Sequence, residues 1–568
     1  MSKRTVSGIT LTLLFMSMLT LAFNIQPVKA SRTIYIRADG SVEPDTAPIS
    51  TTDNITYTFT DNIYDSIVVE RDNVVVDGAG YTVQGEGTET GNGITLSNRT
   101  TITITNIEIK SFHLGIAIYR SEHNLISGNN ITNNHDGFLL HESTSNLICG
   151  NNMIHNDYDG IAIYKSLNNT ISRNTFINNT FAIRIGASSN NTISGNNITN
   201  NKASGIALYE SSKTNTISGN NMIGNDEFGV LVKSSSTNTI SGNNMTDNSV
   251  GVLVESSPNI TISENHITSN EVGINLWESS NNSISRNCVT NSSSDGLYFD
   301  SSSDNIISRN QITDNAWNGI HLKYNSNYNR INGNTISNNR LNGVSVEADS
   351  NDNEITNNEI VNNEEDGIDL VDSSRNKIRS NNVTDNFTGI YINTGNSTFN
   401  VIYHNNFINN MYQATCYALN TTWHNGYPSG GNYWSDYTIV DSLGGPYQNE
   451  TGGDGIGDTP YIIDEKNKDN YPLVEPWSPP PPIIGDLNND GIVDISDLFV
   501  AGKAFGSYAG HPRWDSAADM NKDNIVNIID IVLIASARAS LHHRHQLLLL
   551  LLHQRFLRLE AHQLKVMP

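Results

Sequence analysis

Cysteine is scarce in this chain, which has three in 568 residues. Cys149, Cys288 and Cys416 are too few and too scattered to form a disulfide framework or a zinc site of known spacing. Basic residues are also few, with 33 Lys and Arg against 58 Asp and Glu and a formal net charge of −25. This balance disfavours nucleic acid and anionic membranes, which require clustered cations, and favours a divalent cation as a companion.

The N-terminal 30 residues have the pattern of an export signal. Lys3 and Arg4 precede an apolar run from Ile9 to Phe23, and Ala30 ends a small-x-small cleavage site. The apolar run is short for a bilayer span of ~20 residues and is followed by polar chain. We therefore expect a signal peptide at 1–30, no stable membrane span, and a secreted protein that is extracellular or attached to the cell surface.

A repeat of 22 to 24 residues begins at Gly93. Its most regular step is a glycine followed by an apolar residue, with Ala182 filling one gap. The glycines are Gly93, Gly115, Gly137, Gly160, Gly205, Gly229, Gly251, Gly273, Gly296, Gly319, Gly343, Gly367 and Gly389. Each glycine opens a short alternating run, such as Val252 to Glu255, which is typical of a strand. A leucine-rich signature is missing, so the period favours a β-helix over a leucine-rich solenoid.

Two asparagine columns follow the same period. The first is Asn129, Asn151, Asn174, Asn196, Asn220, Asn243, Asn265, Asn287, Asn310, Asn334, Asn358, Asn381 and Asn405. The second stands five residues later: Asn134, Asn156, Asn179, Asn201, Asn225, Asn248, Asn270, Ser292, Asn315, Asn339, Asn363, Asn386 and Asn410. Asparagine tolerates the left-handed conformation of sharp corners, and stacked amides can hydrogen-bond along a column.

These patterns predict an all-β fold, a right-handed single-stranded parallel β-helix, with both columns at its corners. The apolar residues between the columns should fill the interior: Ile131, Met153, Ile198, Met222, Ile267, Ile312, Ile336 and Val383. The segment before the repeat lacks the ladders and should cap the first coil, because an exposed strand edge aggregates. Asn54 and Asn420 are the better glycosylation candidates, since most other sequons belong to the ladder phrase.

One strand of each coil should present polar and aromatic side chains outward, two and four residues after its glycine. Aromatic rings suit sugar faces, and the ligand-binding candidates are Tyr119, Tyr164, Tyr209, Trp277 and Tyr298. If catalysis occurs, we expect it near Asp300, His321, Lys323, Glu347 and Asp369, because paired carboxylates can act as acid and base on a glycosidic bond. Charged residues also solvate exposed strands, which favours a binding or adhesive rod over an enzyme.

The coils and the segment after them resemble the NosD-like carbohydrate-binding and sugar-hydrolase β-helix family, from about Thr33 to Pro476. The motifs that carry the resemblance are Gly431-Asn-Tyr-Trp-Ser-Asp-Tyr, Asp454-Gly-Ile-Gly-Asp-Thr-Pro-Tyr and Asp469-Asn-Tyr-Pro-Leu. The resemblance implies binding of a polysaccharide or cell-surface glycan. A polysaccharide-degrading glycoside hydrolase or lyase is the alternative, and NosD-like periplasmic copper handling is a second one. The histidines of the repeat form no cluster of soft or imidazole ligands that would suit copper.

After a Pro-rich linker, residues 485–537 resemble a type I dockerin, a small α-helical domain with two EF-hand-like calcium loops. Oxygen ligands alternate in both loops, the seventh position acts through its carbonyl, and aspartate stands at the twelfth. The expected calcium ligands are Asp486, Asn488, Asp490, Ile492, Asp494 and Asp497 in the first loop and Asp519, Asn521, Asp523, Ile525, Asn527 and Asp530 in the second. Gly491 and Asn524 should take the sharp turns. The resemblance implies a cohesin-like protein partner.

The expected organisation is therefore a signal peptide (1–30), a cap with the first coils (31–92), the repeats (93–410) and a NosD-like C-terminal segment (411–476). A linker (477–484), the dockerin-like domain (485–537) and a low-complexity tail (538–568) follow. The tail carries His542, His543 and His545 and six leucines from Leu547 to Leu552, and it fits neither module.

Overall fold

The computed structural model describes residues 33–438, 440–478, 485–487, 493, 495–511 and 513–535. The expected signal peptide, residues 479–484 of the linker and the tail from residue 538 lie outside the described residues. The chain divides into two compact units, one ending at Trp477 and the other beginning at Ser478. No helix in the described ranges is long and apolar enough to cross a membrane.

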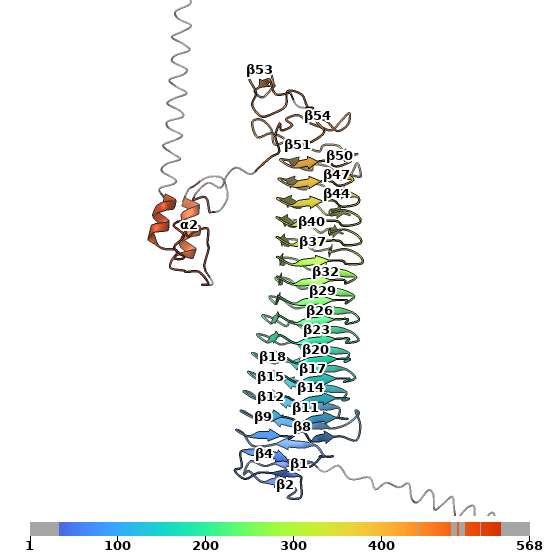
Figure 1. Ribbon diagram of the computed structural model, residues 1–568, viewed down its shortest axis with the longest axis vertical. Coiled ribbons are helices and arrows are strands. Elements are labelled where there is room, and N and C mark those ends of the chain that lie inside the picture. Colours follow the sequence, from blue (N-terminus) through green and yellow to red (C-terminus); the bar gives the residue numbers. More distant parts are fainter. Residues whose placement is uncertain are drawn as a thin grey trace, which may run out of the picture. The chain divides into compact units, whose positions relative to one another are not determined.

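The first unit is a parallel β-helix, visible in Figure 1 as a stack of arrows. One coil consists of β13 (Asn130–Thr132), β14 (Asp136–His141) and β15 (Leu147–Cys149), and β16 (Asn152–Ile154) begins the next. Each strand pairs with its equivalent in the neighbouring coils, so that Ile131 of β13 lies opposite Ile109 and Met153. The predicted all-β solenoid is confirmed.

Three parallel sheets result, which we name A, B and C. Sheet B runs from β4 (Thr56–Phe59) to β48 (Val401–Tyr403), and sheet C from β7 (Thr82–Gln84) to β51 (Tyr433–Trp434). Sheet A contains the longest strands. In spatial order they are β1 (Ile34–Ile36), β5 (Ile67–Val69), β8 (Asn92–Ser97), β11 (Leu114–Tyr119), β14, β17 (Asp159–Tyr164), β20 (Phe181–Gly186), β23 (Ser204–Tyr209), β26 (Phe228–Lys233), β29 (Val250–Glu255), β32 (Val272–Trp277), β35 (Leu297–Asp300), β38 (Ile320–Lys323), β41 (Val344–Glu347), β44 (Asp366–Val371), β47 (Thr388–Ile392) and β50 (Tyr412–Cys416).

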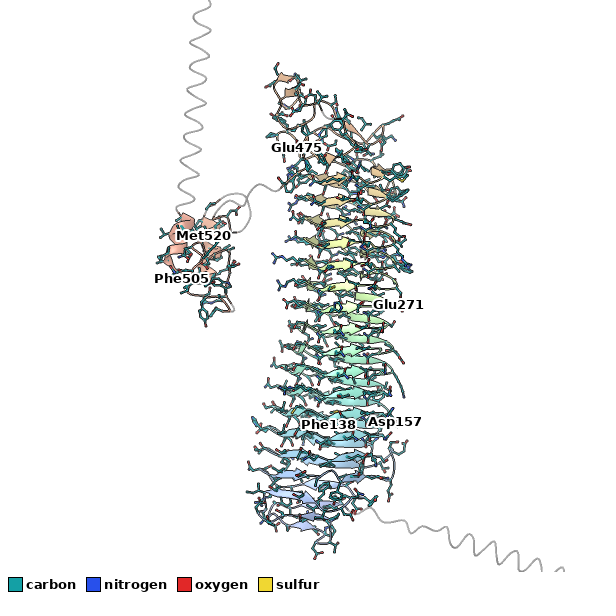
Figure 2. All side chains as sticks on the ribbon, viewed as in Figure 1. Phe138, Asp157, Glu271, Glu475, Phe505 and Met520 are labelled. Atoms are coloured by element: carbon teal, nitrogen blue, oxygen red, sulfur yellow. The ribbon has the colours of Figure 1, made fainter. Side chains whose placement is uncertain are left out.

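The interior is filled as the alternation predicts. Ile131, Met153, Ile198 and the other residues expected between the columns are fully buried. In β29, Val252 and Val254 point inward while Glu255 remains partly exposed. Phe138 likewise lies inside the coil, whereas Asp157 and Glu271 lie at its edge in Figure 2. Burial at about 25 cal/mol per Å² of apolar surface, repeated in every coil, holds the stack together.

Both asparagine columns lie at corners of the coil and form hydrogen-bonded ladders. The side-chain N–H of Asn129 donates to Oδ1 of Asn151 at 3.0 Å, and that of Asn134 donates to Oδ1 of Asn156 at 3.1 Å. The same oxygen also accepts the backbone N–H of the preceding rung, 3.0 Å in the case of Asn129 and Asn151. The ladders therefore satisfy corner backbone groups that would otherwise be buried without partners.

The prediction that asparagine occupies the two columns because it tolerates the left-handed conformation is wrong. The left-handed residue is the one that precedes each rung: Gly128 has φ 69° before Asn129, and Asn133 has φ 53° before Asn134. Arg173 takes the same conformation before Asn174 with φ 53°. Asparagine is thus selected at the rungs for its amide, whose donor and acceptor both find partners, rather than for its tolerance of positive φ.

A third corner, between sheets A and B, carries two further ladders that were not predicted. One is made of asparagines five residues before the first column, where Asn124 donates to Asn146 at 2.9 Å. The other is made of serines, where the backbone N–H of Ser143 donates to Oγ of Ser166 at 3.0 Å. The same period marked these residues in the sequence, with Ile260 as an interruption in the asparagine ladder.

The recurring glycine is required by close approach between coils. A Cβ on Gly115 would lie 2.5 Å from the carbonyl oxygen of Gly137 and 2.8 Å from the side chain of Ile131. The corresponding position in Gly251 would be 2.6 Å from the oxygen of Gly273. The glycine column therefore marks the start of the strands of sheet A and aligns them with one another.

Antiparallel strands close the first end of the solenoid. β2 (Val42–Glu43) pairs with β1, and β3 (Ile49–Ser50) pairs with β4. Because β1 and β5 already belong to sheet A, the coil begins before the asparagine columns do. The expected cap therefore includes genuine coils.

The NosD-like motifs form the other end. The indole of Trp434 stacks between Phe407, at 4.7 Å, and Tyr461, at 4.3 Å. The first asparagine ladder ends where Asn405 donates to Asn432 at 3.0 Å. The buried carboxylate of Asp469 accepts the backbone N–H of Asn432 at 2.7 Å and the indole N–H of Trp434 at 3.1 Å. The motif residues thus terminate the ladder with an acceptor.

The second unit has a small core of its own. Its helices are α2 (Ile495–Ala504) and a helical segment that includes residues 528–535. Ala501, Ala518, Val526 and Ile534 are fully buried between them. Met520 and Phe505 are labelled on this unit in Figure 2.

Candidate functional site

The outward face of sheet A gathers the polar and aromatic candidates because its register stacks equivalent positions. Two residues after the glycine, Tyr298, His321, Ser345, Asp369 and Tyr391 lie opposite one another in consecutive strands from β35 to β47. Four residues after it, Trp277 lies opposite Asp300, which lies opposite Lys323. Two sites on this face differ in character.

The first site is an aromatic groove of about 640 Å³ over β14 to β26. Its lining includes Tyr158, Tyr164, Phe181, Arg184 and Tyr209. The rings form contacts along the groove: Tyr158 meets Phe181 edge-on at 5.6 Å. We call this site the aromatic groove.

Stacked rings continue beside the groove. His141 stacks on Tyr164 at 5.6 Å and lies 6.1 Å from Tyr119, on the side toward the first coil. Tyr164 and Tyr209 therefore line the groove, while Tyr119 extends its aromatic surface by one coil. The other two ligand-binding candidates lie farther along the face, with Trp277 exposed by 47% and Tyr298 beside His321.

An ion pair links Arg184, which lines the groove, to the buried Asp159 beneath it. Nε of Arg184 lies 3.0 Å from Oδ1 of Asp159, whose side chain is fully buried. The guanidinium also lies 5.1 Å from the ring centre of Tyr158. Burial raises the pKa of Asp159 to about 6, although Arg184 opposes that rise. Donors fixed in this way are suited to hydroxyl groups of a ligand.

The second site is a polar cluster over β35 to β44, centred on His321. The two ring nitrogens face carboxylates: Nδ1 lies 3.4 Å from Oδ2 of Asp295, and Nε2 lies 3.4 Å from Oε1 of Glu347. Lys323 lies 3.5 Å from the other oxygen of Glu347. Burial alone would lower the pKa of His321, but its contacts with Asp295 and Glu347 raise it to about 9. The same contact with His321 holds the pKa of Glu347 at about 2.

Ser345 connects this histidine–carboxylate group to Asp369. Its hydroxyl lies 3.1 Å from Oε1 of Glu347 and 3.4 Å from Oδ2 of Asp369. Asp369 is buried, and burial raises its pKa to about 7, with Asp366 and Glu347 adding to the rise. Two carboxyl groups held close together therefore differ strongly in protonation. We call Asp295, His321, Ser345, Glu347 and Asp369 the polar cluster.

The structure thus brings together four of the five candidates for catalysis. Asp300 is the exception, since its carboxylate accepts a hydrogen bond from the neighbouring Ser301 at 2.7 Å and not from a member of the cluster. Asp295 and Ser345 were missed. Asp295 stands immediately before a repeat glycine, and its Oδ1 accepts the backbone N–H of Asn318 at 3.0 Å and the side-chain N–H of Asn318 at 2.9 Å.

The second calcium-type loop holds its carboxylates with backbone N–H groups. Oδ1 of Asp519 accepts from Asp523 N at 3.1 Å, and Oδ2 accepts from Asn524 N at 2.8 Å. Asp530, at the twelfth position, accepts from Met520 N at 2.8 Å. Asn524 has φ 67°, as expected for the sharp turn. The donor types fit a hard cation, and these contacts orient the carboxylates at the first and last positions.

The first loop repeats this arrangement where it is described. The backbone N–H of Leu487 donates to Asp497 at 2.7 Å, which is the counterpart of the contact from Met520 to Asp530. The candidates Asn488, Asp490, Ile492 and Asp494, with Gly491, lie outside the described residues.

Copper finds no matching donor set in the parts of the chain that the structure covers. No group of three or more His, Cys, Asp or Glu side chains there is arranged to hold a metal ion. The rings of His113 and His135 lie 4.6 Å apart and are tilted by 30°, and Cys149, Cys288 and Cys416 are free thiols. The exposed Asn54 and Asn420 remain glycosylation candidates.

Family models match most of the described chain. The model of a right handed beta helix region matches residues 213–360, which confirms the predicted hand of the solenoid. The model described as periplasmic copper-binding protein (NosD) matches residues 49–228 and 316–439. The model of the dockerin type I domain matches residues 484–537. No curated protein sequence matches the chain.

Solved structures with similar coils include three of different kinds. The periplasmic alginate epimerase AlgG is 14% identical, with 66% of this chain and 80% of that chain covered and a TM-score of 0.31. Tailspike protein 3 of bacteriophage CBA120 is 12% identical, with coverage of 68% and 59% and a TM-score of 0.35. PfbA, a surface adhesin of Streptococcus pneumoniae, is 12% identical, with coverage of 51% and 82% and a TM-score of 0.27. These scores are too low to carry any property of those proteins to this chain.

Proposed function

Since this chain belongs to the family of NosD, described as periplasmic copper-binding protein, and carries a type I dockerin domain, we propose that it is an exported glycan-binding β-helix protein that attaches to a cohesin-type partner through a calcium-loaded dockerin. The aromatic groove on sheet A carries the proposal for glycan binding. We assign the calcium requirement to the dockerin loops, whose carboxylate and carbonyl oxygens fit a hard cation.

The groove suits a polysaccharide in shape and chemistry. Its lining residues come from consecutive strands of sheet A, β14 to β26, so an extended chain that follows the groove would cross several coils. Tyr164 and Tyr209 offer ring faces to the apolar faces of sugars, and Arg184, fixed by Asp159, offers N–H donors to their hydroxyl groups. A site that combines rigid aromatic rings with few oriented polar groups is typical of ligand recognition.

The dockerin unit has the features of a protein-binding module. Its helices leave several large apolar side chains in solvent, including Ile495, Phe499, Ile528 and Ile529, with Phe499 exposed by 68%. Solvent-facing apolar side chains on a unit with such a small core favour docking to another protein. Calcium would be held by the carboxylate and carbonyl oxygens of the two loops, and the cation would neutralise carboxylates that otherwise repel one another.

Glycan binding can be tested by affinity electrophoresis of the full chain in gels that contain neutral polysaccharides. Tyr164→Ala and Tyr209→Ala should each weaken binding by about tenfold or more, because truncating a central aromatic contact commonly costs over about 1.4 kcal/mol. Tyr447→Ala is the matched control, since this tyrosine is exposed by 83% and lies in the C-terminal segment. The proposal would be contradicted if all variants were retarded as strongly as the wild type, or if no polysaccharide retarded even the wild type.

Attachment can be tested with a type I cohesin in calcium and in chelator. Binding should require calcium and should be weakened by Asp519→Ala, whereas Asp515→Ala, outside both loops, should bind normally. Cohesin binding that survives chelation would argue against a calcium-loaded dockerin.

A further inference from the structure

The polar cluster contains two buried atoms whose hydrogen-bonding capacity is not used. Oδ1 of Asp369 and Nε2 of His321 have no hydrogen-bond partner, although both side chains are exposed by only 7%. The contact of Nε2 with Glu347 at 3.4 Å is an ion-pair distance without hydrogen-bond alignment. Leaving a buried polar atom unpaired costs about 1–3 kcal/mol, so such atoms on a substrate-facing surface indicate a ligand group that completes them.

The two carboxyl groups of the cluster have complementary states. Glu347 faces His321 and Lys323 and is ionised at neutral pH. Asp369 faces Ser345, Asp366, Glu347 and His321, and burial keeps much of it protonated near pH 7. Hydrolysis of a glycosidic bond needs these two states, an acid that gives a proton to the leaving oxygen and a carboxylate beside the sugar ring.

The spacing of the pair favours direct attack. The hydroxyl of Ser345 lies 3.1 Å from Oε1 of Glu347 and 3.4 Å from Oδ2 of Asp369, so these two oxygens lie no more than about 6.5 Å apart. Glycosidases that retain configuration hold their carboxyls about 5–5.5 Å apart, whereas inverting enzymes need more room for a water molecule. A carboxylate that stays ionised at neutral pH is available to attack the anomeric carbon, and its low pKa makes it a good leaving group in the second step.

The charges around the pair select the substrate class. The cations His321 and Lys323 face Asp295 and Glu347, so that Asp300 and Asp366 leave this part of sheet A with additional negative charge. A polyuronate would be repelled, and no cation is left among these side chains to neutralise its carboxylate, as a lyase requires. The aromatic groove lies on the same face of the same sheet, so a long neutral glycan could occupy both sites.

We propose that Asp369 and Glu347 are the acid and the nucleophile of a retaining glycoside hydrolase site for neutral polysaccharides that lie along sheet A. The inference rests on the proposed glycan binding. In the first step the proton on Asp369 moves to the glycosidic oxygen, the bond from that oxygen to the anomeric carbon breaks, and an oxygen of Glu347 bonds to the same carbon. In the second, water attacks that carbon, Asp369 takes its proton and Glu347 is released.

His321 and Ser345 are positioning residues in this scheme. His321 keeps Glu347 ionised, and Ser345 holds the two carboxyl groups in register. His321→Gln should therefore move the acid limb of the pH–rate profile to higher pH, because Glu347 keeps Lys323 but loses the imidazolium. A residue that only supports the fold would lower the rate without moving the limb.

The test uses the full chain and a panel of neutral glucans, mannans, xylans and galactans, with release of reducing ends as the readout. Asp369→Asn and Glu347→Gln should each lower the rate by about 10²-fold or more. Asp352→Asn and Glu354→Gln are matched controls, because these carboxylates pair with Arg375 and Arg379 at 2.9 Å on the side of sheet B. Azide should restore turnover to Glu347→Ala and yield a glycosyl azide, which a structural role cannot produce.

The proposal is overturned if no neutral polysaccharide releases reducing ends, if the two variants match their controls, or if polyuronates give unsaturated products instead. These outcomes are separable from failure of glycan binding. If retardation depends on Tyr164 and Tyr209 but no reducing ends are released, the binding function stands and the catalytic function is removed. If neither retardation nor release of reducing ends is observed, both functions are removed.

Discussion

Replacing one rung of an asparagine ladder should destabilise the solenoid far more than replacing its neighbour in sequence. Asn220 is buried, and its amide donates to the carbonyl of Ile193 at 2.9 Å and to Asn243 at 3.0 Å. Its Oδ1 accepts the backbone N–H of Asn196 at 3.0 Å. The adjacent Asn221 is partly exposed; it donates to the exposed Asn197 of the preceding coil and accepts from the partly exposed Asn244 of the following coil.

The magnitude follows from the groups left behind. Asn220→Ala leaves the N–H of Asn196 and the carbonyl of Ile193 without these partners in a buried corner. At about 1–3 kcal/mol for each such group, the loss is about 2–6 kcal/mol. Asn221→Ala removes a solvent-accessible contact and should cost less than about 1 kcal/mol.

Hydrogen exchange measured by mass spectrometry is the suitable assay, because a repeat array can open locally before it unfolds globally. Peptides that cover the coils beside Asn220 should lose protection in Asn220→Ala and keep it in Asn221→Ala, while distant coils stay protected in both. Equal protection in the two variants, or a uniform loss along the whole array, would refute the reasoning that each rung serves its neighbouring coils.

Three further outcomes are expected. Ile198→Asp should unfold the coils around it, because an unpaired buried charge is very costly, whereas Glu255→Gln should change the melting temperature little. Burial raises the pKa of Asp369 in the folded state to about 7, compared with about 3.9 in the unfolded chain. Its contribution to stability is therefore complete below about pH 3.9 and is lost as the pH rises through 7. Asp369→Asn should remove this pH dependence from urea midpoints measured between about pH 4 and 8. Titration of calcium into Asp519→Ala should show one binding event where the wild type shows two.

The sequence predicted the coil because one pattern was repeated often enough to exclude other periods. Alternation identified inward residues such as Ile131, and the two columns located two of the corners. The third corner carries the same period, and counting five residues back from Asn129 would have reached Asn124. Conformation at the corners was harder to predict, because the residue with positive φ varies from Gly128 to Arg173, and its conformation is imposed by the ladder beside it.

The candidate site shows a different limit. Periodicity predicted that His321, Glu347 and Asp369 would be neighbours, since sheet register converts a fixed period into contact. It did not predict the burial of His321 and Asp369, because outward positions of a strand are normally solvated. Asp295 and Ser345 change the chemistry of the cluster, the first by holding His321 and the second by touching both carboxyl groups. Neither is distinguished by residue type in a chain rich in Ser and Asp.

Two regions of sheet A, β14 to β26 and β38 to β44, carry different side chains on the same repeated backbone. Every coil offers two outward positions after its glycine, so the fold itself imposes no preference for aromatic or ionisable residues there. In β14 to β26 these positions and their neighbours supply Tyr164, Tyr209 and Arg184, whereas in β38 to β44 they supply His321, Glu347 and Asp369. Burying ionisable groups such as His321 and Asp369 on one face weakens a solenoid. This cost is the reason that we propose a chemical role for the polar cluster rather than a stabilising one.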